Sequence, residues 1–111
     1  MDRSRHSLTD ITCPDREPLV MVTAYDSTSA RLADDAGVDL ILVGDTLAEF
    51  ALGYDSTTPV TVEEMLHHCR AVTRTRPRAL VVGDMPLGSY QVSEEEAVRN
   101  AIRFVKEGGV D

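Results

Sequence analysis

The sequence contains no long hydrophobic run, few aromatic residues and only two cysteines. No apolar stretch among the 111 residues approaches the roughly 18 residues of a membrane-spanning helix, and residues 1–6 lead into no signal-peptide core. Cys13 and Cys69 lie far apart, outside any CxxC or Cys/His ligand spacing, which is typical of reduced thiols. We therefore expect a cytoplasmic protein with no membrane partner and no structural disulfide.

Positively charged residues are also scarce. The chain has 11 Lys and Arg residues and 19 Asp and Glu residues, which gives a net charge of −8. This balance argues against a general nucleic-acid-binding surface. The exception is a local arginine cluster at Arg70, Arg74, Arg76 and Arg78. We interpret the cluster as solvated side chains that complement the negative end of a helix dipole. The glycines form no GxGxxG or Walker A pattern, so a nucleotide-phosphate loop has no support.

What the sequence does contain is a regular alternation of short apolar runs and amphipathic segments. The runs read as buried strands, and the segments between them have the period of helices. The expected strands cover residues 19–23, 38–43 and 79–82, and the expected helices cover residues 26–36, 61–73 and 93–107. Residues 1–18 are expected to form a lead-in arm or short helix, and residues 109–111 to begin a fourth strand.

Local signals mark where the helices begin and which face they bury. Asp26 is expected to cap the first helix, and Thr-x-x-Glu and Ser-x-x-Glu capping boxes are expected at residues 61–64 and 93–96. The residues expected to face the core are Met65, Leu66, Cys69 and Val72 in the second helix, and Ala97, Ala101, Phe104 and Val105 in the third. The connection at 44–59 exceeds the usual length of a βα loop, and loops of that size tend to be functional.

This βαβαβα order predicts one α/β domain over residues 1–111, with parallel strands, right-handed crossovers and no second domain. Two architectures fit the order. One is a small open flavodoxin-like sheet, and the other is the N-terminal part of a (βα)8 TIM barrel, which needs about 200 residues or more. Because the sequence stops where a fourth strand begins, we favour about three βα units of a barrel.

The tripeptide Val-Gly-Asp occurs twice, at residues 43–45 and 82–84, each time closing an expected strand. Parallel strands end at the same edge of a sheet, so Asp45 and Asp84 are expected near one another, where α/β proteins place their chemistry. Adjacent carboxylates are costly unless they are protonated, paired with a cation or bound to a metal, and oxygen ligands suit Mg²⁺. The alternative is that each aspartate caps the loop or helix after its strand.

Two other groups of residues could carry chemistry. Tyr25 closes the first expected strand, so we expect it on the same rim, where its hydroxyl could bind an anion or a ketone. His67, His68 and Cys69 have the composition of a metal site, but neighbours in a helix point about 100° apart and cannot all hold one ion. We interpret this triplet as structural.

Several segments of the chain occur together in an order and spacing that match a known family. They are MVTAYD at 21–26, ILVGDTL at 41–47, LGYDST at 52–57 with PVT at 59–61, and DMP at 84–86 with SY at 89–90. From about residue 19 onward the chain resembles ketopantoate hydroxymethyltransferase, also called 3-methyl-2-oxobutanoate hydroxymethyltransferase. The resemblance implies a barrel of the phosphoenolpyruvate/pyruvate superfamily type.

The resemblance also implies a Mg²⁺-dependent transferase of pantothenate and coenzyme A biosynthesis that is a homo-oligomer in its full-length form. Its reaction moves a hydroxymethyl group from the co-substrate 5,10-methylenetetrahydrofolate to 3-methyl-2-oxobutanoate, a 2-oxo acid, and gives 2-dehydropantoate. Asp45 and Asp84 match the family's metal-binding aspartates and lie against the substrate. Thr46 stands where the family usually has Ser, whose hydroxyl helps to hold the substrate carboxylate.

The chain departs from the family pattern in two places. The Lys and Glu of the family's next strand, and its general base, lie beyond Asp111, so we identify no catalytic residue within the chain. The stretch 48–51 places a charge, that of Glu49, in a loop where the family has small and aliphatic residues. Two other functions remain open: a non-catalytic assembly fragment, and another 2-oxo acid lyase of the same superfamily.

Overall fold

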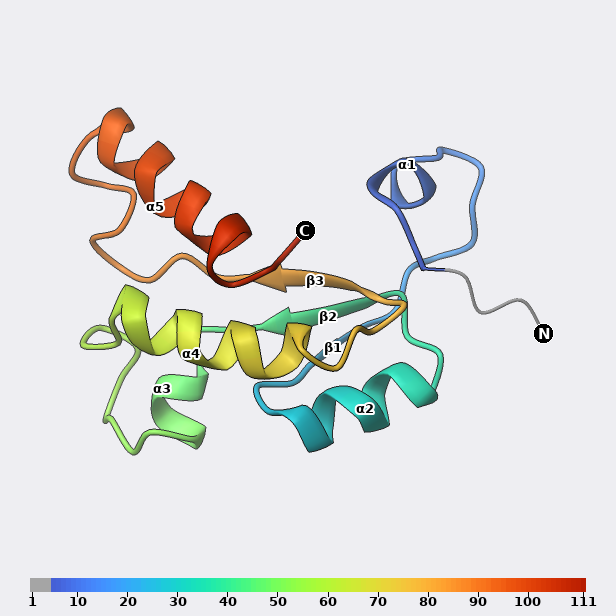
Figure 1. Cartoon of the computed structure of the whole chain (residues 1–111), viewed down its shortest axis with the longest axis horizontal. Helices are drawn as coiled ribbons and strands as arrows, with labels where there is room; N and C mark the ends of the chain where they lie inside the picture. Colours follow the sequence, from blue (N-terminus) through green and yellow to red (C-terminus); the bar gives the residue numbers. More distant parts are fainter. Residues whose placement is uncertain (1–4) are drawn as a thin grey trace.

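The computed structural model of the protein describes residues 5–111 as a parallel sheet with helices between its strands (Figure 1). The sheet has three strands in the order β1-β2-β3. The strands are β1 Met21–Thr23, β2 Leu40–Val43 and β3 Leu80–Gly83, and the helices are α1 Leu8–Ile11, α2 Ser27–Asp35, α3 Leu47–Phe50, α4 Val62–Thr73 and α5 Glu94–Lys106. The expected α/β class and parallel strands are therefore confirmed.

The strand order favours part of a barrel over a flavodoxin-like sheet. Each strand pairs with its neighbour in sequence, so the order nowhere reverses as it does at the switch point of a doubly wound sheet. Helix α4 packs on both β2 and β3 and also contacts α2 and α5, so these helices share one layer. Within the described residues the sheet is open, and this arrangement is consistent with part of a TIM barrel.

The core lies between the sheet and this helical layer. Ile41 and Val81 are partners in adjacent strands, so their side chains point to the same face, and both are at most 1% exposed. Gly83 allows the close approach of the layer, because a Cβ there would lie 3.0 Å from the Phe104 ring and 3.1 Å from the Cys69 sulfur. The opposite face of the sheet is less covered, since Met21 and Val82 are 46% and 36% exposed.

Two aspartates that follow Gly-Val pairs hold the beginnings of the strands in the same way. The Asp39 N–H donates to the Val20 carbonyl at 2.9 Å, and the Val20 N–H donates back to the Asp39 carboxylate at 2.9 Å. Asp111 repeats both bonds with Val81, at 2.9 and 3.0 Å. Residues 109–111 form no assigned strand, but this pairing sets Asp111 beside β3 where a fourth strand was expected.

The N-terminal segment of the described chain crosses the end of the sheet where the strands begin (Figure 1). It contains the short helix α1. Arg5 forms an ion pair with Asp111 at 2.6 Å, Arg16 forms one with Asp39 at 3.4 Å, and the His6 N–H donates to the Arg78 carbonyl. No helix in residues 5–111 is both long and apolar enough to cross a membrane.

The helix signals read from the sequence have mixed outcomes. Asp26 caps α2, and Thr61 and Glu64 form the expected box at the start of α4, whose four expected core residues are all buried. Ser93 caps α5, but the Glu96 side chain makes no return bond, so the second box is only half formed. On the expected buried face of α5, Phe104 is buried and Ala97 is half-buried, but the prediction was wrong for Ala101 and Val105, which are exposed. Helix α3 was missed within the expected loop 44–59.

Candidate functional site at the strand ends

Asp45 and Asp84 lie together just beyond the ends of β2 and β3. The Asp84 carboxylate accepts the backbone N–H of Asp45, with 3.0 Å between the nitrogen and Oδ2. The Asp84 N–H in turn donates to the Val43 carbonyl at 3.0 Å, which continues the parallel ladder past the assigned strands. The two aspartates therefore lie at the same edge of the sheet, as their positions after the strands predicted.

The two Val-Gly-Asp motifs are offset by one residue rather than aligned. The register pairs Val43 with Gly83, so Asp84 is level with Gly44 and Asp45 lies one position further along the chain. Because of this offset, the Asp84 side chain extends past Gly44 to the amide of Asp45, the next residue along the neighbouring chain segment. Neither aspartate caps a helix: the N-cap of α3 is Thr46, which makes no capping bond with its side chain.

A shared cavity of about 410 Å³ opens over the acids, lined by Asp45, Gly83, Asp84, Met85 and Tyr90. Thr46 follows Asp45 in the chain but is not among the residues that line this cavity. A Cβ added to Gly44 would lie 3.5 Å from the Asp84 Oδ2 and 3.5 Å from the Thr46 hydroxyl oxygen. The absence of a side chain at Gly44 thus leaves a space bordered by a carboxylate and a hydroxyl, both of which can bind a polar ligand.

The electrostatics of the site favour a cation. Burial raises the pKa of the Asp45 carboxyl above its usual 3.8, and the negative charge of Asp84 raises it further. No Lys, Arg or His within residues 5–111 forms an ion pair with either acid. Two carboxylates next to one another without a cationic side chain fit a divalent ion.

The pair would supply only part of a metal's coordination shell. No group of three or more His, Cys, Asp or Glu side chains in the described part of the chain is placed to hold an ion. Mg²⁺ commonly takes one or two protein carboxylates and fills its remaining positions with water and substrate oxygens, so a pair of acids suits it. Zn²⁺ would require more protein ligands, and His67 and His68 lie away from the acids on α4.

The structure does not bring Tyr25 to the acids. The His68 Nδ1 donates to the Tyr25 carbonyl at 2.7 Å, and the two rings meet edge to face at 6.0 Å. Tyr25 and His68 therefore contact each other beside α2 and α4. Glu49 also lies away from the cavity, with its side chain exposed on α3, so the charge expected in the site loop does not enter the site.

Tyr90 is the aromatic residue that does reach the cavity, and reasoning from strand ends missed it. A tight turn fixes its position: the buried Ser89 donates its N–H and its hydroxyl to the Pro86 carbonyl, at 3.0 and 2.6 Å. The Asn100 amide of α5 donates to the Ser89 carbonyl at 2.7 Å. The sequence does offer one signal for Tyr90, because Tyr90 lies in the loop between Asp84 and Ser93, the N-cap of α5.

Comparisons with known proteins agree with this geometry. Residues 6–111 match the family model described as ketopantoate hydroxymethyltransferase. The 3-methyl-2-oxobutanoate hydroxymethyltransferase of Ignicoccus hospitalis is 62% identical over 92 residues, which are 83% of this chain and 35% of that protein. The enzymes of that name from Moorella thermoacetica and Heliobacterium modesticaldum are 59% and 57% identical, over 86% and 84% of this chain and 35% and 34% of their own length.

The chain thus spans about a third of the length of the curated relatives that it matches. The match itself extends over nearly all of the chain, from His6 to Asp111, and includes both Val-Gly-Asp motifs and the loop that carries Tyr90. On this evidence the chain belongs to the ketopantoate hydroxymethyltransferase family.

Proposed function

We propose that this chain supplies the metal- and 2-oxo-acid-binding part of a Mg²⁺-dependent hydroxymethyltransferase built on a (βα)8 barrel of the phosphoenolpyruvate/pyruvate superfamily type. The reaction is transfer of a hydroxymethyl group from 5,10-methylenetetrahydrofolate to 3-methyl-2-oxobutanoate, giving 2-dehydropantoate for pantothenate and coenzyme A biosynthesis. The observation that carries the proposal is the Asp45–Asp84 pair, which lies at the strand ends and has no cationic partner among the described residues.

Asp45 and Asp84 would hold the metal, whose chemistry when bound is that of a Lewis acid toward the ketone oxygen of a 2-oxo acid. The Asp45 amide fixes one oxygen of Asp84, so that carboxylate is oriented before any ligand arrives. The Thr46 hydroxyl lies, like the Asp84 carboxylate, beside Gly44, and it would donate to the substrate carboxylate. Met85 and Tyr90 form the remaining wall and would shield the substrate from water. We assign binding and orientation, rather than proton transfer, to these residues.

The proposal is tested first by binding. Titration calorimetry of the chain with 3-methyl-2-oxobutanoate in the presence of Mg²⁺ should show saturable binding that Asp84→Asn abolishes. Asp55→Asn is the matched control, because Asp55 is an exposed carboxylate outside the cavity. Equal binding by wild type and Asp84→Asn would contradict the metal role of Asp84.

A second test separates catalysis from binding. Formation of 2-dehydropantoate by the chain, given Mg²⁺ and both substrates, would support the full activity. Binding without product would support the alternative of a non-catalytic module, which the open sheet and its exposed apolar residues favour. Turnover of a different 2-oxo acid by carbon-carbon bond cleavage would instead support a lyase of the same superfamily.

A further inference from the structure

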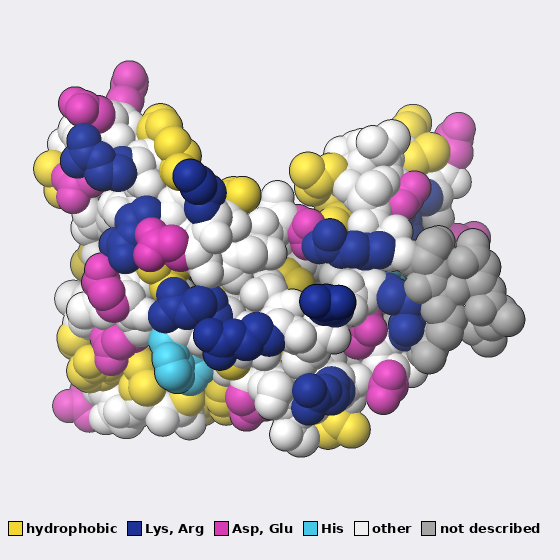
Figure 2. Space-filling view, viewed as in Figure 1, with side chains coloured by type: hydrophobic (Ala, Val, Ile, Leu, Met, Phe, Trp, Pro, Cys, Tyr) yellow, Lys and Arg dark blue, Asp and Glu magenta, His cyan; other side chains and the backbone are white. Residues whose placement is uncertain are grey.

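The arginine cluster at the end of α4 is not fully explained by solvation. Arg78 turns inward and forms an ion pair with Asp34 of α2 at 3.6 Å. Arg70, Arg74 and Arg76 form no ion pair with any residue in the range 5–111. Figure 2 shows Lys and Arg side chains gathered across the middle of one face, over the end of α4 and the start of the sheet. A concentration of positive charge is unexpected in a chain with a net charge of −8.

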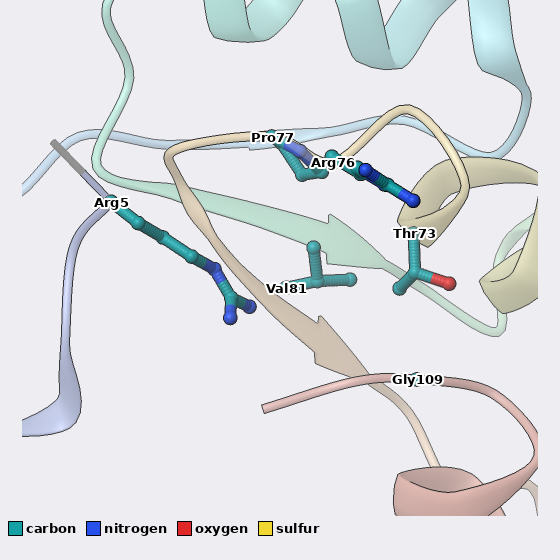
Figure 3. Close-up of a pocket in the computed structure, with 6 residues that line it drawn as sticks. All are labelled: Arg5, Thr73, Arg76, Pro77, Val81 and Gly109. Atoms are coloured by element: carbon teal, nitrogen blue, oxygen red, sulfur yellow. The ribbon is translucent and has the colours of Figure 1, made fainter. Parts of the chain in front are cut away.

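A cavity of about 320 Å³ lies within this region, near the beginning of β3. It is separate from the Asp45–Asp84 site, which lies beyond the other end of the same strand. Figure 3 shows the residues around it, with Val81 between two arginines that come from distant segments. The lining residues are Arg5, Thr73, Arg76, Pro77, Val81 and Gly109.

The part of the cavity wall formed by Thr73, Val81 and Pro77 is held in place before any ligand binds. The Thr73 hydroxyl donates to the Gly108 carbonyl at 2.7 Å, which joins the end of α4 to the segment after α5. Val81 is 1% exposed and is bonded through its N–H to Asp111. Pro77 is buried. This part of the wall therefore needs no rearrangement when a ligand binds.

The two arginines that line the cavity retain free hydrogen-bond donors. Arg5 uses Nη2 to bond both oxygens of Asp111, at 2.6 and 2.7 Å, and this bond leaves its Nε and Nη1 groups available. No side-chain hydrogen bond is formed by Arg76 within residues 5–111, so its whole guanidinium is available. The Asp111 charge offsets that of Arg5, so the surplus positive charge comes from Arg76.

The backbone of Arg76 gives an independent indication. Its φ is +51°, and it is the one non-glycine residue with positive φ in the described chain. It follows the end of α4, where helices often place glycine because a side chain is strained in the left-handed region. Strained backbone conformations cluster at ligand-binding positions, where the side chain is retained despite its cost.

We propose that this cavity binds a phosphate group of a small ligand, held between the guanidinium groups of Arg76 and Arg5. Guanidinium groups match phosphate oxygens in pairs, and a cavity of this size suits a small phosphorylated molecule. A small ligand is favoured over a nucleic acid because the net charge of −8 would repel a long polyanion.

The test uses inorganic phosphate as the probe, in titration calorimetry of the chain at low ionic strength. Wild type should bind one phosphate saturably, and Arg76→Gln should weaken the affinity about tenfold, the effect expected for loss of charge-assisted hydrogen bonds. Arg31→Gln is the matched control, because Arg31 is exposed on α2 and away from the cavity. Its affinity should equal that of wild type.

A glycine variant separates binding from folding. Arg76→Gly should raise the unfolding temperature without phosphate, because glycine adopts positive φ freely, and should lose the rise in unfolding temperature that phosphate gives to wild type. Equal loss of affinity in Arg76→Gln and Arg31→Gln would overturn the proposal in favour of general electrostatic attraction. Absence of saturable binding by wild type, or full binding by Arg76→Gly, would also overturn it.

Discussion

At the scale of single residues, Asp45 carries a measurable signature of the strand-end site. Its folded-state pKa is raised above 3.8, so the folded chain holds this proton more tightly than the unfolded chain does. The free energy of unfolding should therefore fall as pH rises from about 4 through the raised pKa of Asp45. Asp45→Asn removes this loss, so without metal at pH 7 the variant should be at least as stable as wild type. Urea unfolding between pH 4 and 8 measures the difference.

Magnesium should reverse the order of the two proteins. In wild type Mg²⁺ should raise the unfolding temperature, because it binds the folded acid pair, and in Asp45→Asn it should have little effect. Asp55→Asn should behave as wild type in both conditions, since Asp55 is exposed and lies outside the cavity. An equal response to Mg²⁺ in Asp45→Asn and wild type would argue against coordination by Asp45.

The two thiols provide a second prediction at this scale. Burial raises the pKa of the Cys69 thiol to about 12, and its side chain is 0% exposed, whereas Cys13 is exposed. Since the thiolate is the reactive form, one thiol should react with Ellman's reagent in the folded chain and both in urea. In Cys13→Ser the folded chain should show no fast reaction. A fast reaction in that variant would mean that Cys69 is accessible, contrary to its packing against α5.

Residue chemistry at the strand ends could be predicted from sequence only in part. Asp45 and Asp84 were found because a repeated motif after each strand fixes where a side chain emerges. Tyr25 satisfied the same rule, but its ring packs on His68 instead of entering the cavity. Tyr90 reaches the cavity through a turn that the hydrogen bonds of Ser89 and Asn100 hold in place, and neither of these residues lies at a strand end. Strand periodicity carries no information on where such a turn directs its side chains.

At the scale of elements, the capping boxes of α4 and α5 should differ in their energetic effect. Thr61→Ala should destabilise the chain by about 1 kcal/mol, because it leaves a helix N–H without its acceptor. Glu64→Ala should also destabilise, since Glu64 accepts bonds from the Thr61 N–H and from the Tyr54 hydroxyl. Glu96→Ala is the matched control and should have little effect, because the Glu96 side chain makes no return bond at α5. Thermal unfolding measures all three.

The pH dependence of the Glu64 contribution has a definite sign. The hydrogen bond from the Thr61 N–H, and then that from Tyr54, lower the Glu64 pKa below its usual 4.5. The contribution is therefore fully present above pH 4.5 and is lost as pH falls through the lowered value. A difference between wild type and Glu64→Ala that persisted unchanged at pH 2 would show that packing, rather than ionised hydrogen bonding, is responsible.

Elements were predicted best where local chemistry alone decides them. The caps of α2 and α4 follow from Asp26 and Thr61, and the bonds they make are within four residues. Helix α3 covers only Leu47–Phe50, which is too short for a helical period to show. On α5 the period correctly indicated an amphipathic helix, but it could not show that Phe104 alone would be fully buried. Burial depends on neighbouring elements, which the period of one helix does not describe.

At the scale of the whole molecule, the order of elements predicted parallel strands, because a strand–helix–strand connection favours a parallel pair. It left open whether the helices share one layer, since a flavodoxin-like sheet with helices on both faces fits the same order. The chain is also less compact than a closed domain of the same length. The radius of gyration is 14.3 Å, above the roughly 13 Å typical of a compact domain of this length. The sheet face that carries Met21 and Val82 is only partly covered, and α5 packs mainly on α4.

Exposed apolar residues on α5 lead to a prediction about association. Val98, Ile102 and Val105 form a stripe along α5 and are 59%, 51% and 56% exposed, so self-association would remove apolar area from water. Sedimentation velocity should show concentration-dependent association, and Val98→Lys with Ile102→Lys should weaken it. Glu96→Gln, which also makes the charge of α5 more positive but lies on another side of the helix, should not. If wild type stayed monomeric at high concentration, or if Glu96→Gln dissociated it equally, the apolar stripe would not be the contact.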